Sequence, residues 1–94
     1  MAKLTPEQLL AKVKHAIGIT GDYQDNTIQI YIDEVKEFLE AAGVHATVLN
    51  TDKVVGIVAR GVLDLWNYGA GDGTLSKYFY QRAGQLALEP EVTE

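Results

Sequence analysis

Residues 51–76 read TDKVVGIVARGVLDLWNYGAGDGTLS, a long apolar segment that is closed by a glycine-rich loop. At about 100° per residue its apolar side chains cover more than half of a helix circumference. The polar side chains form a narrow strip of Lys53, Arg60, Asp64 and Asn67. A helix this apolar normally lies in a core with neighbours on several sides. We therefore expect a long central apolar helix over about 51–68, with the other helices packed around it.

Two glycines interrupt this central helix, and each lowers its helix propensity. Gly61 faces the apolar side, where it lets a neighbouring helix approach closely. Gly56 lies near the polar strip, and the sequence gives no packing reason for it. Asn50 or Thr51 is expected as the N-cap of the central helix. The loop at 67–74 ends this helix.

A shorter helix is predicted at about 6–17. Thr5 is a good N-cap, Pro6 suits the first helical position, and Gln8 completes a capping box. Gly18 supplies the stop. The inner stripe of this helix is expected to contain Leu9, Leu10, Val13, Ala16 and Ile17.

A second helix is predicted at about 26–42, with Asp22 or Asp25 as its cap and Gly43 as its stop. The face expected to pack inward comprises Ile28, Tyr31, Ile32, Val35, Phe38, Leu39 and Ala42. Ile30 points away from this face. A single exposed isoleucine is common, but contact with another subunit is the alternative.

The remaining segments complete an all-α prediction. Residues 44–49 are interpreted as a loop, because a single edge strand without a partner is not stable. A fourth helix is predicted at about 76–88, with Ser76 as N-cap and an inner stripe of Phe79, Ala83, Leu86 and Ala87. Residues 89–94 are expected to be frayed. The sequence thus predicts one domain over 1–94, a small bundle of four main helices.

The composition of the chain disfavours two classes of function, tight nucleic-acid binding and insertion into a membrane. The chain has 94 residues and a net charge of -5, from 13 acidic and 8 basic residues. Nucleic-acid-binding proteins usually have a clustered basic surface, whereas these basic residues are scattered. No signal peptide is visible, and the longest apolar run is too short and too charged to span a bilayer. We expect a soluble protein that neither binds DNA tightly nor enters a membrane.

No set of residues indicates catalysis, a cofactor or a metal. The loop at 69–73 lacks the lysine and the preceding strand of a P-loop, so a helix terminator is favoured over an anion site. The two histidines, His15 and His45, are not spaced as metal ligands. The acidic residues that resemble paired carboxylates lie on a solvent-facing stripe: Asp33, Glu37 and Glu40.

Aromatic residues cluster around this loop: Trp66, Tyr68, Tyr78, Phe79 and Tyr80. One interpretation is that Trp66 and Phe79 seal the core where the central helix meets the fourth. The alternative is a subunit or partner interface, which favours exposed tyrosines. Arg60 and Asp64 form an i, i+4 pair that could set register in an oligomer. The candidate interface residues are Ile30, Trp66, Tyr68, Tyr78 and Tyr80.

The order of segments resembles the small head–tail connector (adaptor, or head-completion) proteins of tailed phages and prophages, particularly of Gram-positive hosts. The resemblance covers about residues 4–88. Its more specific part lies in the second half, GIVARGVLDLWNYG, then GDG and SKYFYQR, whereas DNTIQIYIDEVKEFLEAAG in the first half is common in helical proteins.

The resemblance implies a helical structural protein of the virion without enzymatic activity. Such adaptors form a ring under the portal protein, extend the DNA channel after packaging and dock the next connector or the tail. The resemblance also implies self-association and passage of duplex DNA without specific binding. It places the protein at the head–tail junction after assembly in the bacterial cytoplasm.

Two alternatives remain from the residues alone. A small helical DNA-binding or regulatory protein would need a basic recognition helix, and the best candidate carries only Lys77 and Arg82. A small enzyme or ligand-binding domain would have to use the glycine loop without an accompanying base or metal ligand.

Overall fold

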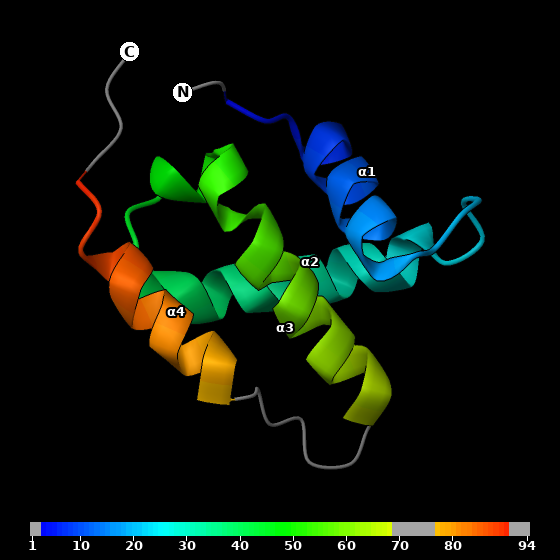
Figure 1. Ribbon diagram of the computed structural model, residues 1–94. Helices are drawn as coiled ribbons and strands as arrows, with labels where there is room; N and C mark the ends of the chain where they lie inside the picture. The colour runs from blue at the N-terminus through cyan, green and yellow to red at the C-terminus, as the bar shows by residue number, and fades with distance from the viewer. Residues whose placement is uncertain (1–2, 69–76, 91–94) are drawn as a thin grey trace.

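The computed structural model describes the backbone of residues 3–68 and 77–90 and the side chains of residues 3–66 and 77–90. Within these ranges the chain forms four α-helices, α1 (Pro6–Ile17), α2 (Asp25–Ala41), α3 (Val55–Tyr68) and α4 (Lys77–Ala87). Two short 3-10 turns, η1 (Val48–Asn50) and η2 (Asp52–Val54), precede α3 (Figure 1). The described residues contain no strand, so the predicted all-α bundle of four helices is confirmed.

Helix α1 has the predicted bounds because its ends are determined locally. The backbone N–H of Thr5 donates to Gln8 Oε1 at 2.9 Å, and the N–H of Gln8 donates to Thr5 Oγ1 at 3.1 Å. This is the predicted capping box, with Pro6 at the first helical position. At the other end Gly18 has φ 77°, the left-handed conformation that glycine adopts without strain.

The cap predicted for α2 is wrong. The N-cap is Gln24, whose side chain makes no capping hydrogen bond, and Asp25 is the first helical residue. The Asp25 carboxylate instead lies 2.6 Å from the ammonium of Lys14, and both side chains are partly buried. This ion pair joins the end of α1 to the start of α2, and it explains why Asp25 is not available as a cap.

The start predicted for the third helix is also wrong, because α3 begins at Val55 and not at residue 51. Thr51 is extended, with φ −120° and ψ 166°, and its hydroxyl donates to the carbonyl of Val48 at 2.8 Å. Its backbone forms an isolated bridge with Lys3. This pairing with the N-terminal segment holds Thr51 outside the helical region. Neither Asn50 nor Thr51 therefore caps α3 with its side chain.

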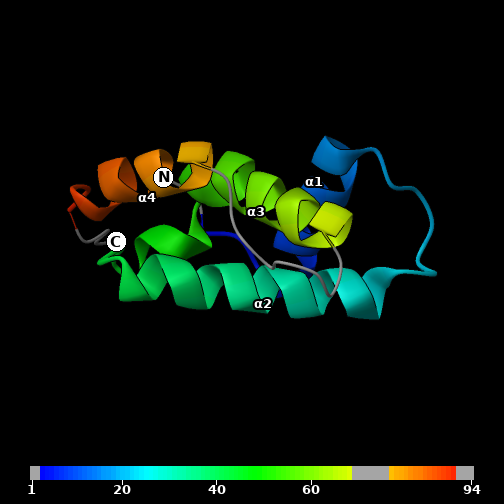
Figure 2. The same ribbon diagram turned by 90° about the horizontal axis from the view of Figure 1, so that it is seen from below.

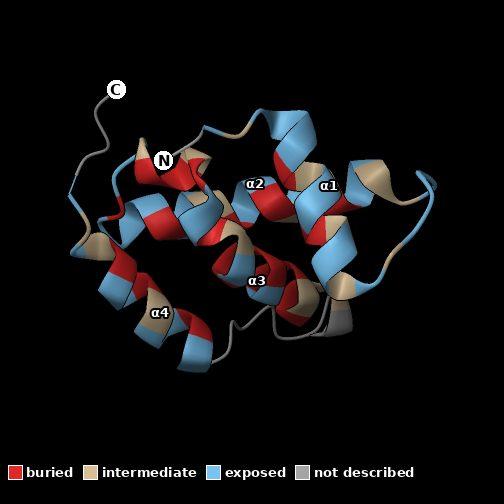
Figure 3. Cartoon of the chain, turned by 45° about the horizontal axis from the view of Figure 1, so that its top comes forward, coloured by how far each residue is buried: buried red, intermediate tan, exposed pale blue. Residues whose placement is uncertain are grey.

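The helices form two layers in a slab of about 35 × 27 × 16 Å. Figure 2 shows α2 in one layer and α1, α3 and α4 in the other. Helix α3 contacts each of the other three helices. Figure 3 shows the buried residues on the sides of the helices that face one another. The largest fully buried side chains are Phe79, Ile28, Ile32, Leu39, Leu49 and Leu86.

The helices approach one another closely at Gly61. A Cβ atom placed there would lie 2.7 Å from Val35 Cγ2 and 3.0 Å from the ring of Phe79. No side chain fits between α3, α2 and α4 at this point. The prediction that Gly61 allows a close helix approach is confirmed.

The inner stripe of α4 agrees with the prediction, because Phe79, Ala83 and Leu86 are buried and Ala87 is half-buried. The expected N-cap, Ser76, lies outside the described residues. After α4, Glu89 accepts a hydrogen bond from the ammonium of Lys53 at 2.6 Å. Of the tail expected to be frayed, residues 91–94 lie outside the described range.

Candidate interaction surfaces

An open groove runs between α1 and the start of α3. One hollow of about 400 Å³ is lined by Ala11, Lys12, His15, Ala16, Asp52 and Val55. A second hollow of about 240 Å³ is lined by Ala16, Ile17, Gly56, Ala59, Arg60 and Leu63. The two hollows adjoin at Ala16, and we call the combined surface the α1/α3 groove.

Small side chains keep this groove open. Ala11 and Ala16 line the first hollow, and Ala16 lines the second hollow together with Gly56 and Ala59 of α3. A Cβ atom placed on Gly56 would meet nothing within 4 Å. Gly56, which has no packing role that the sequence predicts, is therefore part of the open surface of the groove.

Two cationic side chains border the groove. Lys12 lies 3.6 Å from Asp52, and both side chains are about half exposed, so the pair is weak. The Arg60 guanidinium lies 3.6 Å from Asp64, with Arg60 half exposed and Asp64 buried. Both cations thus remain open to solvent and to a partner.

The outer side of α2 carries a second surface, opposite the buried face of that helix. Ile30 is 65% exposed and Phe38 is 39% exposed. With the residues that share their side of the helix they form what we call the α2 ridge: Ile30, Glu34, Glu37, Phe38 and Ala41. All of these residues except Ile30 also line a shallow hollow of about 270 Å³. Neither Glu34 nor Glu37 forms an ion pair with another described residue. The ridge is therefore apolar at two points and acidic between them.

Two residues expected to pack inward from α2 are exposed, namely Phe38 and Ala42. Both lie at the edge of the apolar stripe, where the neighbouring layer no longer covers the helix. The four residues at the centre of the stripe are buried as predicted: Ile28, Ile32, Val35 and Leu39.

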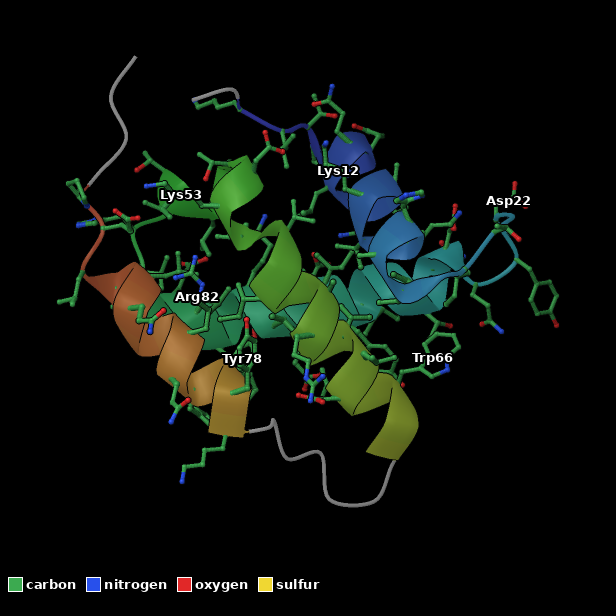
Figure 4. The ribbon with its side chains drawn as sticks, viewed as in Figure 1. Lys12, Asp22, Lys53, Trp66, Tyr78 and Arg82 are labelled. Atoms are coloured by element: carbon green, nitrogen blue, oxygen red, sulfur yellow. The ribbon has the colours of Figure 1, made fainter. Side chains whose placement is uncertain are left out.

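The predicted aromatic cluster separates into two groups. Trp66 is half-buried and packs edge-on against Tyr31 of α2, with ring centroids 6.1 Å apart. Tyr78 lies on the other side of α3, where the Arg60 guanidinium is 5.9 Å from its ring centre. Figure 4 shows Trp66 and Tyr78 on opposite sides of α3. The interpretation that Trp66 seals the junction with α4 is wrong, whereas Phe79 is buried as expected.

The other candidate interface residues are also apart from one another. Tyr78 and Tyr80 are 56% and 52% exposed on α4, and Ile30 is on the α2 ridge. Tyr80 packs edge-on against Phe79, with ring centroids 5.8 Å apart. The side chain of Tyr68 and the loop at 69–76 lie outside the described residues. The four candidates whose side chains are described therefore do not form one patch.

The residues considered for chemistry are solvated in the described part of the chain. His15 and His45 are exposed, and so are Asp33, Glu37 and Glu40. The Asp33 carboxylate accepts a hydrogen bond from the amide of Gln29 at 2.9 Å. Among residues 3–68 and 77–90, no group of three or more His, Asp or Glu side chains is placed to hold a metal ion. None of the described helices is both long enough and apolar enough to cross a bilayer.

The α1/α3 groove is not among the features predicted from the sequence. Two signals in the sequence pointed to the surfaces described above. Gly56 has no role in packing, and it lies on the polar side of its helix. The four-residue spacing of Ile30, Glu34 and Phe38 places them along one side of α2.

Comparison with known protein families gives one match. The family model described as phage gp6-like head-tail connector protein matches residues 7–59, more than half of the chain. The matched range contains α1 except its first residue, all of α2 and the first five residues of α3. It lies mainly in the half of the chain whose motifs were considered common, and not in the half considered specific. No curated protein and no solved structure gives a significant match.

Proposed function

The chain belongs to the phage gp6-like head–tail connector family, and from that premise we propose that it assembles as a ring under the portal protein. Family membership indicates a structural connector role in the phage particle, with contacts to other head or tail proteins. The proposed ring extends the DNA channel after packaging and docks the next connector or the tail. The match over residues 7–59 carries this proposal, and the all-α fold is consistent with it.

The charge of the chain supports passage of DNA without specific binding. The net charge is -5, and the basic residues do not gather on one helix. An acidic channel wall repels the phosphate backbone and lets it slide, whereas proteins that hold DNA neutralise several phosphates with Lys and Arg. The same feature disfavours a DNA-binding regulator, because α4 carries only Lys77 and Arg82.

We propose Ile30, Trp66, Tyr68, Tyr78 and Tyr80 as contact positions in the assembled particle. Exposed aromatic and aliphatic side chains are frequent anchors of protein interfaces. Tyr78 and Tyr80 are about half exposed on α4, which suits them to a portal, connector or tail protein. The protein would act at the head–tail junction of the virion, after assembly in the cytoplasm of the bacterial host.

Electron microscopy of the protein mixed with the portal of the same phage tests this proposal. We expect a closed ring on the portal and, in a phage that lacks the protein, DNA-filled heads that do not join tails. The connector role would be contradicted if the protein did not bind the portal and if tails joined normally in a phage that lacks the protein.

Duplex DNA binding at low salt, measured on the assembled ring, is expected to be weak. Tight binding would contradict passive DNA passage.

A further inference from the structure

We propose that the α2 ridge of one copy of this chain seats in the α1/α3 groove of the next copy. This inference rests on the proposed ring and names the contact that builds it. The two surfaces lie in different layers of the slab, because the ridge is on the outer side of α2 and the groove lies between α1 and α3 (Figure 2). A contact between two different surfaces can be repeated from copy to copy, and it closes into a ring when its rotation divides the circle.

The apolar parts of the two surfaces complement each other. Ile30 and Phe38 project from α2 with large exposed side chains. The groove offers small apolar residues, among them Ala16, Gly56 and Ala59, which leave space for side chains from outside. An amphipathic helix that places its exposed residues in an apolar groove is a common mode of protein recognition.

The charges of the two surfaces are also complementary. Glu34 and Glu37 on the ridge have no ion-pair partner among the described residues, and both are exposed. Lys12 and Arg60 border the groove, and their own ion pairs are long, at 3.6 Å. Opposite charges across an interface fix register and suppress wrong contacts. The other α2 acids on the neighbouring side, Asp33 and Glu40, are not used by this contact.

The exposed face of α4 is a poorer occupant for the groove. The helix contains Lys77 and Arg82 and no acidic residue. Its docking in the groove would bring like charges toward Lys12 and Arg60. Tyr78 is also already in contact with the Arg60 guanidinium of its own chain. The α2 ridge is therefore the occupant that these charges favour.

Charge reversal tests the contact in two chains. The first variant is Glu34→Lys with Glu37→Lys, and the second is Lys12→Glu with Arg60→Glu. Each variant alone is expected to associate at least about tenfold more weakly than the native chain, because like charges face each other. In an equal mixture, every junction between the two variants pairs opposite charges again, so alternating oligomers should form. Sedimentation measures this, with portal added if the native chain needs it.

Circular dichroism and thermal unfolding of each variant show whether it is folded. Recovery of association in the mixture cannot come from a general loss of folding. The proposed contact would be overturned if each of the two charge-reversed variants, measured alone, associated as strongly as the native chain. Failure of the mixture of two folded variants to associate would overturn it as well.

Cross-linking gives a second measurement, because the native chain contains no cysteine. Gly56→Cys adds a thiol in open space, and Ile30→Cys replaces an exposed side chain. A chain with both substitutions, treated with a short bismaleimide, should give a ladder of cross-linked oligomers. Ala41→Cys with Gly56→Cys tests the other end of the ridge. The matched control combines Gly84→Cys on α4 with Gly56→Cys and should give no ladder.

These outcomes separate the contact from the proposed function. If the native chain forms rings and only the control pair cross-links, the ridge–groove contact is wrong and the connector role stands. If the native chain forms no oligomer, either alone or with portal, both the contact and the ring are wrong. A ladder from either ridge pair, together with recovery in the mixture, supports the contact.

Discussion

The two sides of α3 differ most clearly at their glycines. At Gly61 the helix meets α2 and α4 so closely that an added methyl group would lie 2.7 Å from Val35. At Gly56, five residues earlier along the chain, an added methyl group would meet nothing within 4 Å. The same residue type thus serves two opposite purposes on one helix.

This difference separates what the fold requires from what it leaves free. Around Gly61 the bundle is closed, and the side chains there are held by neighbours from two helices. At Gly56 an added methyl group would have no neighbour within 4 Å, and helix propensity would favour alanine at that position. A small residue that the fold does not need is a reason to look for a partner that uses the space.

The largest effect is expected on the closed side, from Phe79→Ala. The ring is almost fully buried between α3 and α4, and its removal leaves a cavity beside Gly61. The free energy of unfolding should fall by about 3–5 kcal/mol. Chemical denaturation followed by circular dichroism measures this. A loss below about 1 kcal/mol would show that the contact between α3 and α4 contributes little to stability.

A smaller loss is expected from Gly61→Ala, because the added methyl group overlaps a stiff valine and the ring of Phe79. Overpacking of this kind costs about 1–3 kcal/mol. The double variant with Val35→Ala should be less destabilised than the sum of the two single variants, since the shortened side chain makes room. Additive free energies in this double-mutant cycle would contradict the close approach.

The smallest effect is expected on the open side, from Gly56→Ala. The substitution should raise the free energy of unfolding by about 0.5–1 kcal/mol, because alanine loses less backbone entropy in a helix. Gly84→Ala on α4, where an added Cβ also meets nothing within 4 Å, is the matched control. Destabilisation by Gly56→Ala would mean that α1 and α3 pack more closely than described above.

Local signals made some helix ends predictable and others not. Helix α1 begins and ends as expected because its capping box and Gly18 act within a few residues of sequence. The third helix begins four residues late, because Thr51 is held extended by Lys3, which is distant in sequence. Asp25 is not a cap because Lys14 on another helix pairs with it. Periodicity and capping describe one segment at a time, so contacts between segments were missed.

The candidate surfaces were less predictable for a related reason. The buried stripe of α2 follows from its periodicity, but the exposure of Phe38 depends on how far the neighbouring layer extends. One of the two interpretations of Trp66 placed it at the junction with α4, yet its ring packs against Tyr31. The α1/α3 groove requires two helices separated in sequence to be placed side by side. Of the residues on these two surfaces, Ile30, which breaks the pattern of its own helix, and Arg60, which pairs with Asp64, were the possible contacts named from the sequence.

The short turn η2 and the residue before it hold both ends of the described chain. Lys3 forms its backbone bridge with Thr51, and Glu89 pairs with Lys53 at 2.6 Å. A tag placed before residue 3 or after residue 90 therefore leaves from the edge of the slab at the upper left of Figure 1. If the protein forms the proposed ring, such a tag should mark a single rim in micrographs and thus show which way the protein is oriented in the ring.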